Sequence, residues 1–272
     1  MIRKWVYRLI FFLGFLLICY PLVSNIVQRQ HQHDAVATYQ SEMSQKDEGE
    51  LEDELNRAKE YNSMLYQTEG AVVDNMDTGI LSDESYQSLL AGEDGVMGSI
   101  EIPKIGVDLP IYHGTSDDVL AIGAGHLQGT SLPVGGQNTH SVITGHRGLP
   151  GSKLFTRLDE IIEGDFVFIN VMGETLAYKV TEIQVIEPDD VSVLDIEEGK
   201  DLLSLITCTP YGINTHRLVV TGERVDYEET QYENISEAIP SLRELAFLAL
   251  PFVIIIIGLI VKIIDWRKNR YV

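Results

Sequence analysis

The chain has 272 residues, with 41 acidic and 20 basic side chains and a formal net charge of -21 at pH 7. A surface this acidic repels phosphate polymers, and the sequence has no basic segment with interleaved aromatic residues, which excludes nucleic acid as an expected partner. Of the two cysteines, Cys19 lies inside a long apolar run while Cys208 does not. A disulfide bond between them is therefore not expected.

An uncharged apolar run lies near each end of the chain. Residues 9–27 follow a basic start, and residues 245–261 precede a basic tail. Each run is about long enough to cross ~30 Å of hydrocarbon. A cleaved signal peptide is the alternative for the first run, but no cleavage site of the A-x-A type follows it. Because short basic flanks stay in the cytoplasm, we expect two membrane spans with both termini inside and the acidic middle outside.

The segment after the first span is charged and favours helices. Over residues 34–69, apolar side chains such as Leu51 and Leu55 recur near helical intervals, which predicts one or two helices. Turn-forming residues at 72–79 interrupt this pattern. The next stretch, 82–91, opens with a serine and two acids, which predicts a loop leading into a short helix.

From Val96 onward the sequence changes to short β-branched runs cut by glycine and proline. These runs occupy residues 98–112, 141–145, 164–172, 174–188, 202–208 and 216–225. They predict one all-β barrel or sandwich over residues 99–225. The stretch 152–161 is the one clear helical insert expected within it.

Cys208 lies at the end of one predicted strand, and Arg217 lies near the start of the next. If these strands pair in antiparallel fashion, the two side chains lie opposite each other on one face. A guanidinium group there favours the thiolate and can donate hydrogen bonds to an oxyanion formed on an attacked carbonyl. The alternatives are a buried structural cysteine and an ordinary surface ion pair at the arginine.

A thiolate that transfers acyl groups also needs a proton donor for the leaving amine, usually a histidine. His146 is the best candidate, because it follows a predicted strand and opens a loop, where catalytic groups are often displayed. A role in turn packing is the alternative. His216 is adjacent to Arg217, so in a strand its side chain points to the opposite face. No metal is expected, because the cysteines and histidines lack metal-ligand spacing.

Two stretches resemble the sortases, the membrane transpeptidases of Gram-positive bacteria. "SLITC" at 204–208 matches their T-L-x-T-C signature, with Ser204 in place of the first threonine, and "TCTPYGINTHRL" at 207–218 is close to the class C form. Residues 111–159, which include "TGHRGLP", also resemble class C, the pilin-polymerising sortases. The resemblance extends over roughly residues 70–225.

The resemblance implies a catalytic site of three residues. Cys208 matches the nucleophile that forms an acyl-thioester, His146 matches the general acid and base, and Arg217 matches the group that stabilises the substrate or the oxyanion. Neither the residues nor the resemblance implies a cofactor.

The resemblance also implies a lid, which class C sortases keep upstream of the barrel as an Asp-Pro-aromatic motif. The matching residues here are Asp74, Asn75 and Met76, so the proline and the aromatic residue are absent. We expect residues 72–78 to cover Cys208, with Asp74 paired to Arg217 and Met76 as a flexible apolar plug. A simple linker between helix and barrel is the alternative.

The predicted fold is mostly β: a sortase-like closed β-barrel with short helices, preceded by a helical and lid segment and flanked by two transmembrane helices. The predicted regions are a cytoplasmic N-terminus and transmembrane helix at 1–27, an extracellular helical and lid segment at 28–98, the catalytic barrel at 99–225, a linker at 226–244, and a transmembrane helix with a basic cytoplasmic tail at 245–272.

These features together predict a cysteine transpeptidase in the cell membrane, with its catalytic domain on the extracellular face. The expected substrates are pilins or surface proteins with an LPxTG-like sorting signal, cleaved between Thr and Gly and joined to an amine such as a pilin lysine. Two alternatives stay open: a cell-wall-anchoring sortase that uses a cell-wall precursor amine, and a non-catalytic membrane-tethered β-domain.

Overall fold

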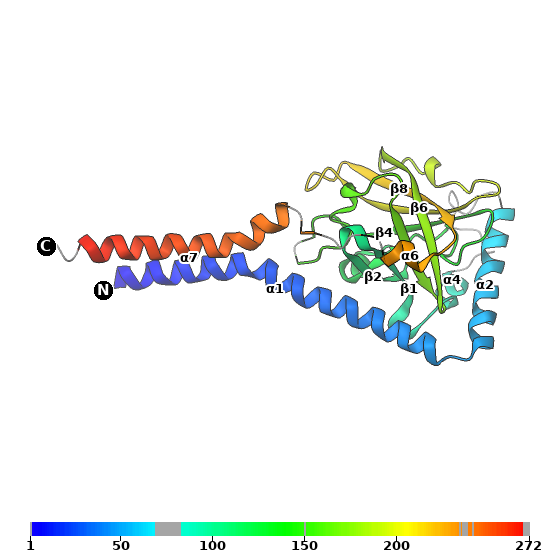
Figure 1. The fold of residues 1–272 in the computed structure, drawn as a ribbon, viewed down its shortest axis with the longest axis horizontal. Helices are drawn as coiled ribbons and strands as arrows, with labels where there is room; N and C mark the ends of the chain where they lie inside the picture. The colour runs from blue at the N-terminus through cyan, green and yellow to red at the C-terminus, as the bar shows by residue number, and fades with distance from the viewer. Residues whose placement is uncertain are drawn as a thin grey trace. The chain divides into compact units, whose positions relative to one another are not determined.

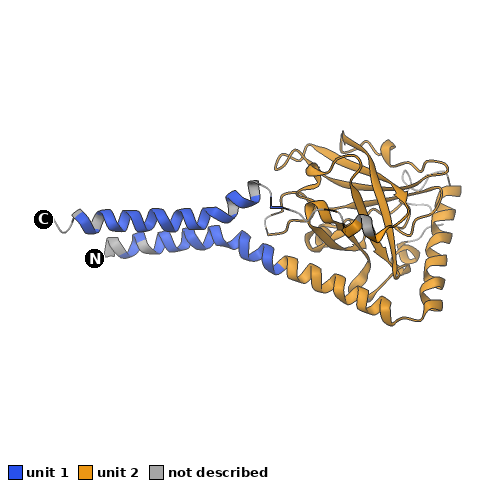
Figure 2. Cartoon of the chain, viewed as in Figure 1, with its two compact units in different colours: residues 1–27, 239–272 blue, residues 28–238 orange. Residues whose placement is uncertain are grey.

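The computed structural model describes residues 2–68, 83–149, 151–233, 235, 239–240 and 242–268. The chain forms two compact units (Figure 2): residues 1–27 together with 239–272, and residues 28–238.

The first unit contains the two apolar segments, both helical. They belong to α1 (Ile2–Gln45), which continues into the second unit, and to α7 (Leu242–Lys268). Both helices are long and apolar enough to cross a membrane, over Trp5–Gln45 and Glu244–Ile264. A Cβ atom added at Gly258 of α7 would lie 3.4 Å from the Phe11 ring of α1, so the bare glycine allows close contact between the two helices.

In the second unit, eight strands from the described residues close into a barrel (Figure 1). The strands are β1 (Val96–Ile102), β2 (Val107–His113), β3 (Ala124–His126), β4 (Thr139–Thr144), β5 (Phe166–Val171), β6 (Glu174–Ile186), β7 (Asp201–Thr209) and β8 (His216–Val225). Their order around the barrel is β1-β2-β3-β4-β7-β8-β6-β5. The pairs β2/β3 and β4/β7 are parallel, and the other neighbours are antiparallel. The prediction of a closed β-barrel is confirmed.

Short helices connect or flank these strands. The α-helices are α4 (Asp83–Ser88), α5 (Asp117–Ile122) and α6 (Glu229–Glu233), and the 3-10 helices are η1 (Glu93–Gly95), η2 (Pro103–Ile105), η3 (Leu158–Glu160) and η4 (Ser192–Leu194).

The structure refines one of the expected runs and differs from the sequence expectation at two other places. The run 98–112 contributes to two strands, β1 and β2, because Pro103 opens the short helix η2 and Gly106 then turns the chain with a φ of 64°. The short strand β3 was missed, because its sequence Ala-Gly-His has no β-branched residue. The expected helix at 152–161 consists of turns and η3, because Leu154 has a φ of 36° and the Phe155 amide donates to the His146 carbonyl instead of continuing a helix.

Alternating side chains on the strands face two different apolar clusters. The barrel interior contains Ile143, Leu203, Leu205 and Val220, among other buried residues. A second, smaller cluster contains Val142, Ile206 and Val219 from the opposite faces of β4, β7 and β8, together with Leu194 of η4. Because successive residues of a strand point to opposite faces, this second cluster marks the outer face of the barrel.

The end of α1 and the helix α2 (Glu48–Gln67) pack against the barrel (Figure 1). Of the apolar residues of α2, Leu55, Ala58 and Leu65 are buried, and Leu51 is partly buried. Asn62 of α2 is also buried, and its side-chain amide exchanges two hydrogen bonds, of 3.0 and 2.7 Å, with the backbone of Leu132. The Tyr39 hydroxyl of α1 donates to the Met97 carbonyl and accepts from the Met172 amide.

The helix α4 is held to the barrel by a buried polar network. The Tyr86 hydroxyl lies 3.0 Å from His126 Nδ1 and accepts the Gly114 amide at 2.9 Å. His126 Nε2 lies 2.9 Å from the Ser131 carbonyl. Since that carbonyl needs a donor, His126 carries its proton on Nε2, and Nδ1 accepts from Tyr86.

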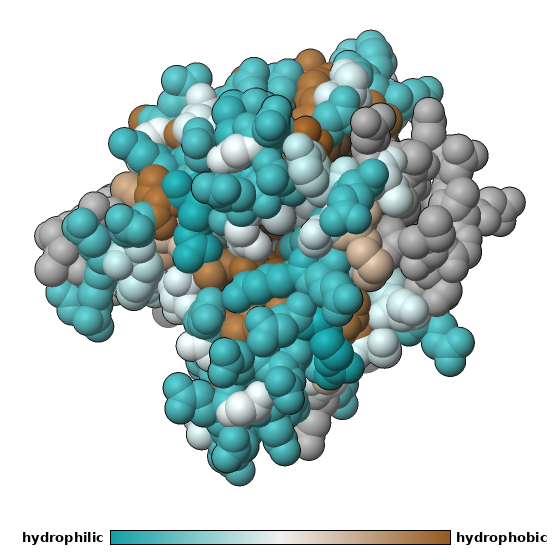
Figure 3. Space-filling model, turned by 90° about the vertical axis from the view of Figure 1, so that its right-hand side faces the viewer, coloured by the Kyte–Doolittle hydropathy of each residue, from teal (hydrophilic) through white to brown (hydrophobic). Residues whose placement is uncertain are grey.

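The surface seen in Figure 3 is mainly hydrophilic, in keeping with the acidic composition, and hydrophobic residues are exposed there only in small areas.

Candidate active site

Cys208 and Arg217 occupy paired positions on neighbouring strands. They are direct partners in the antiparallel register of β7 and β8, at the end of one strand and the start of the other. Directly opposed residues of such a pair have Cβ atoms roughly 4.5–5.5 Å apart. Cys208 is a free thiol and is partly exposed. The strand register therefore places Cys208 and Arg217 directly opposite each other, as the sequence predicts.

His146 reaches the same place from the other side of β7. Strand β4 runs parallel to β7, with Thr144 opposite Ile206, and the Gly145 amide extends the ladder by donating to the Ile206 carbonyl at 3.0 Å. His146 follows two residues after Thr144, as Cys208 follows two residues after Ile206. Position 208 of β7 thus lies between the chain segments that carry His146 and Arg217.

The side chains of Cys208 and Arg217 share the outer face of the barrel. Cys208 follows Ile206 by two positions, and Arg217 precedes Val219 by two, so both point to the side of the outer apolar cluster. Thr207 lies between Ile206 and Cys208 in β7. Its side chain points to the opposite face, and its hydroxyl donates to the Gly145 carbonyl at 2.7 Å. The outer apolar cluster, which Leu194 of η4 helps to bury, therefore begins two residues from the thiol along β7.

The loop that carries His146 is held by the segment that was expected to be helical. The Phe155 ring lies against Gly145, where an added Cβ atom would come within 2.7 Å of it. The Phe155 amide donates to the His146 carbonyl at 3.1 Å, and the Gly148 amide donates to Thr156 Oγ1 at 3.2 Å. Glycine at 145 is therefore required by close packing, and the loop has little freedom.

Arg217 is oriented by the backbone of its own loop. Its Nη1 donates to the carbonyls of Asn214 and His216, at 3.4 and 3.1 Å. None of the ion pairs between described residues includes Arg217. Its remaining N–H groups can thus serve a developing negative charge beside Cys208.

His216 lies away from this group. Its Nε2 is 3.2 Å from Glu187 Oε1, and its Nδ1 is 2.9 Å from Thr215 Oγ1. These contacts agree with the expectation that His216 and Arg217 project to opposite faces of β8.

Sequence reasoning missed one further side chain beside the site, Arg147. The whole residue is 8% exposed, it follows His146 directly, and its Nη1 donates to Thr209 Oγ1 at 3.0 Å. It also forms an ion pair with Asp159 of η3. The sequence signal that could have identified Arg147 is its position directly after the candidate histidine His146.

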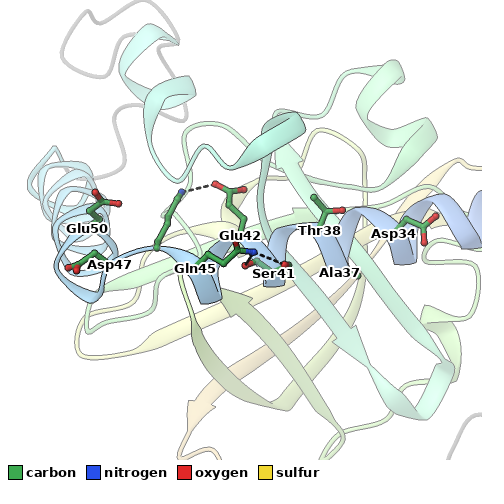
Figure 4. Close-up of a pocket in the computed structure, with 9 residues that line it drawn as sticks. Asp34, Ala37, Thr38, Ser41, Glu42, Gln45, Asp47 and Glu50 are labelled. Atoms are coloured by element: carbon green, nitrogen blue, oxygen red, sulfur yellow. Dashed lines mark hydrogen bonds and ion pairs between the residues drawn. The ribbon is translucent and has the colours of Figure 1, made fainter.

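A pocket of about 950 Å³ lies elsewhere, between α1 and the start of α2 (Figure 4). It is lined by several carboxylates, and Glu42 there pairs with Lys46 at 2.8 Å. None of the three candidate catalytic residues lines it, so we assign it no part in the chemistry. Among the described residues, no three His, Cys, Asp or Glu side chains are grouped as a metal site.

The predicted lid, with Asp74 and Met76, lies outside the described residues. Its role as a cover for Cys208 stays a prediction. The described chain resumes at α4, which Tyr86 holds to the barrel.

The arrangement of a thiol between a histidine and an arginine suits acyl transfer. The sulfur can attack a carbonyl carbon, the guanidinium group can bind the resulting oxyanion, and the imidazole can move a proton to or from an amine.

Comparison with known proteins places the barrel in a family. Residues 100–225 match the sortase domain family. Crystalline sortase C1 from Streptococcus agalactiae is 44% identical, with a TM-score of 0.65, and the match covers 72% of this chain and 100% of that one. Sortase C of Clostridium perfringens, solved with the C-terminal cell wall sorting motif, is 41% identical with a TM-score of 0.62, covering 71% and 99%.

Sortase A of Streptococcus agalactiae is 35% identical over 131 residues, which cover 47% of this chain and 52% of that protein. The chain therefore matches about half the length of this curated relative.

Proposed function

The chain belongs to the sortase family, with class C sortases among its structural neighbours, and from this premise we propose that it is a membrane-bound cysteine transpeptidase that joins pilin subunits. Its substrate is an LPxTG-like sorting signal, cleaved between Thr and Gly. The acceptor is the amine of a pilin lysine. The observation that carries the proposal is the placement of Cys208 on β7 between Arg217 and the His146 loop.

In the first half of the reaction, the Cys208 sulfur attacks the threonine carbonyl carbon. Arg217 donates hydrogen bonds to the oxyanion of the tetrahedral intermediate. The C–N bond to glycine then breaks, and His146 gives a proton to the departing amine. The product is a thioester between Cys208 and the threonine carbonyl.

In the second half, the acceptor amine attacks the thioester carbonyl. His146 takes a proton from the attacking nitrogen, the C–S bond breaks, and the Cys208 thiolate is regenerated. Crystallisation of the Clostridium perfringens relative with a sorting motif supports the same substrate class.

We further propose that α1 and α7 both cross the membrane, with both termini in the cytoplasm and the barrel outside. The support is the length and apolarity of the two helices and their basic flanks. Protease added to intact cells should digest the barrel and spare both tails. Protection of the barrel with digestion of the C-terminal tail would contradict this topology.

The catalytic proposal is tested with the purified full-length protein in detergent. Incubation with peptides of the form Leu-Pro-X-Thr-Gly should give a mass increase on Cys208 equal to the acyl fragment. Cys208→Ala should abolish acyl transfer and shift the thermal midpoint only slightly, because alanine is a mild change at a strand end. Transfer by Cys208→Ala near the parent level would remove the basis of the proposal.

Similarity to sortase A keeps a second candidate, anchoring of surface proteins to a cell-wall amine. The two functions differ in the acceptor. In a deletion strain, loss of high-mass pilin ladders supports pilin joining, whereas loss of monomeric antigen from the wall supports anchoring.

A further inference from the structure

Arg147 joins three segments around the candidate site without facing the substrate side. Its side chain is 4% exposed, and its guanidinium group pairs with Asp159, whose side chain is 30% exposed. Nη1 of the same group donates to Thr209 Oγ1 at 3.0 Å. The arginine thus links the loop after β4, the end of β7 and the helix η3.

The two residues joined by this hydrogen bond are each next in sequence to a candidate catalytic residue. Arg147 directly follows His146, and Thr209 directly follows Cys208. Because neighbouring residues of a strand point to opposite faces, Thr209 lies on the other face of β7 from the thiol. The Arg147–Thr209 hydrogen bond therefore fixes the two chain segments to each other one residue beyond the histidine and the cysteine.

A contribution to folding stability alone does not explain why an arginine is buried at this position. A buried ion pair often contributes no more to the free energy of folding than apolar residues of the same volume. In addition, Arg147 Nε is buried and has no hydrogen-bond partner among the described residues, which adds to the cost of burial. What the arginine provides is a fixed, two-pronged geometry between a loop and a strand end.

We propose that Arg147 is a positioning residue, which holds the His146 loop level with Cys208 through Thr209 and Asp159. This inference rests on the proposed function, since it concerns the proton transfer between His146 and the leaving amine. A misplacement of about 1 Å in such a pair lowers the rate on the order of a hundredfold. At Thr209 the link meets the face of β7 opposite to the thiol.

The test uses full-length protein, a fluorogenic Leu-Pro-Glu-Thr-Gly peptide and hydroxylamine as acceptor. Thr209→Val removes the acceptor oxygen, keeps the side-chain volume and leaves the Arg147–Asp159 ion pair intact. Arg147→Met removes both contacts, and Arg147→Lys restores one of them. Arg157→Met is the matched control, because Arg157 is a neighbouring arginine that pairs with Glu160 in the same segment. The midpoint of thermal unfolding is measured for every variant.

Thr209→Val should lower kcat about tenfold and Arg147→Met about a hundredfold, with KM within twofold of the parent. Arg147→Lys should lie between Arg147→Met and the parent, and Arg157→Met should match the parent. The double variant Arg147→Met with Thr209→Val should be no slower than Arg147→Met alone, because both changes break the same hydrogen bond.

A kcat within twofold of the parent in folded Thr209→Val would overturn the positioning role, as would a loss confined to KM. If Arg147→Met fails to fold, Thr209→Val and Arg147→Lys decide the question. A parent protein that forms no Cys208 thioester would instead overturn the proposed function, so the two failures are distinguishable.

Discussion

Arg217 and His146 approach Cys208 from neighbouring strands on its two sides. The arginine comes from an antiparallel neighbour and the histidine from a loop beyond a parallel neighbour. Backbone hydrogen bonds fix the positions of both residues: Arg217 is part of the β7/β8 ladder, and the His146 carbonyl accepts from the Phe155 amide. Substitution of one of them should therefore affect chemistry more than folding.

We expect His146→Ala to lower kcat by about 10²–10⁴-fold, the usual contribution of a general acid and base. Arg217→Ala should lower it by about 10²–10³-fold, as for loss of an oxyanion donor. His216→Ala should retain activity near the parent level, because its partner is Glu187. Steady-state transpeptidation of a sorting peptide measures all three. Equal damage from His216→Ala and His146→Ala would show that the assignment of strand faces is wrong.

At the scale of elements, the segment between α2 and α4 controls access to the site if it acts as the predicted lid. Both of its neighbours are fixed: Asn62 ties α2 to the barrel, and Tyr86 ties α4 to it. A segment held at both ends can cover a site and open without release of the rest of the chain. An exposed Asp74–Arg217 pair would contribute only about 0–1 kcal/mol, which allows opening by substrate.

Replacement of Asp74 and Met76 together by alanine should speed alkylation of Cys208 and raise hydrolysis of a sorting peptide. The reason is loss of both the ion pair and the apolar plug over the thiol. Alkylation is followed with iodoacetamide and mass spectrometry, and Asn75→Ala serves as the control within the same segment. An unchanged alkylation rate in the double variant would mean that these residues do not cover the site.

At the scale of the whole molecule, the barrel buries neutral histidines under a strongly acidic surface. Burial lowers the pKa of His126 to about 4, against the opposing effect of the Ser131 carbonyl. Burial likewise lowers the pKa of His113 and of His140. Below about pH 6.5 the unfolded chain binds protons at these positions that the folded barrel does not accept.

The free energy of unfolding should therefore fall as pH drops from about 6.5 to about 4. A single such histidine contributes about 1.4 kcal/mol per pH unit, or on the order of 3 kcal/mol over the whole window for His126. Denaturant titrations between pH 4 and 7 measure this slope. His126→Gln should lose part of it, whereas His31→Gln, a change at an exposed position on α1, should keep it. A slope unchanged by His126→Gln would place the acid sensitivity elsewhere.

Elements with a strong local pattern could be predicted from the amino-acid sequence alone. The length of the apolar runs predicted the helices of the first unit, and β-branched runs predicted most strands. The spacing of Cys208 and Arg217 predicted that they pair, because the register of two adjacent strands depends on the length of the loop that joins them. The resemblance of "TGHRGLP" and "SLITC" to sortase motifs supplied the catalytic roles, which stay predictions.

Tertiary structure decided what depends on distant partners. The strand β3 is three residues long and forms only between β2 and β4, so its own sequence carries no pattern. The segment 152–161 does not form a regular α-helix, because the Phe155 amide donates to the His146 carbonyl and the Phe155 ring packs against Gly145. Arg147 is charged and would be expected at the surface, yet Thr209 and Asp159 hold it in the interior. In each case the deciding contact joins residues far apart in the chain or on different elements, and side-chain type alone does not determine such a contact.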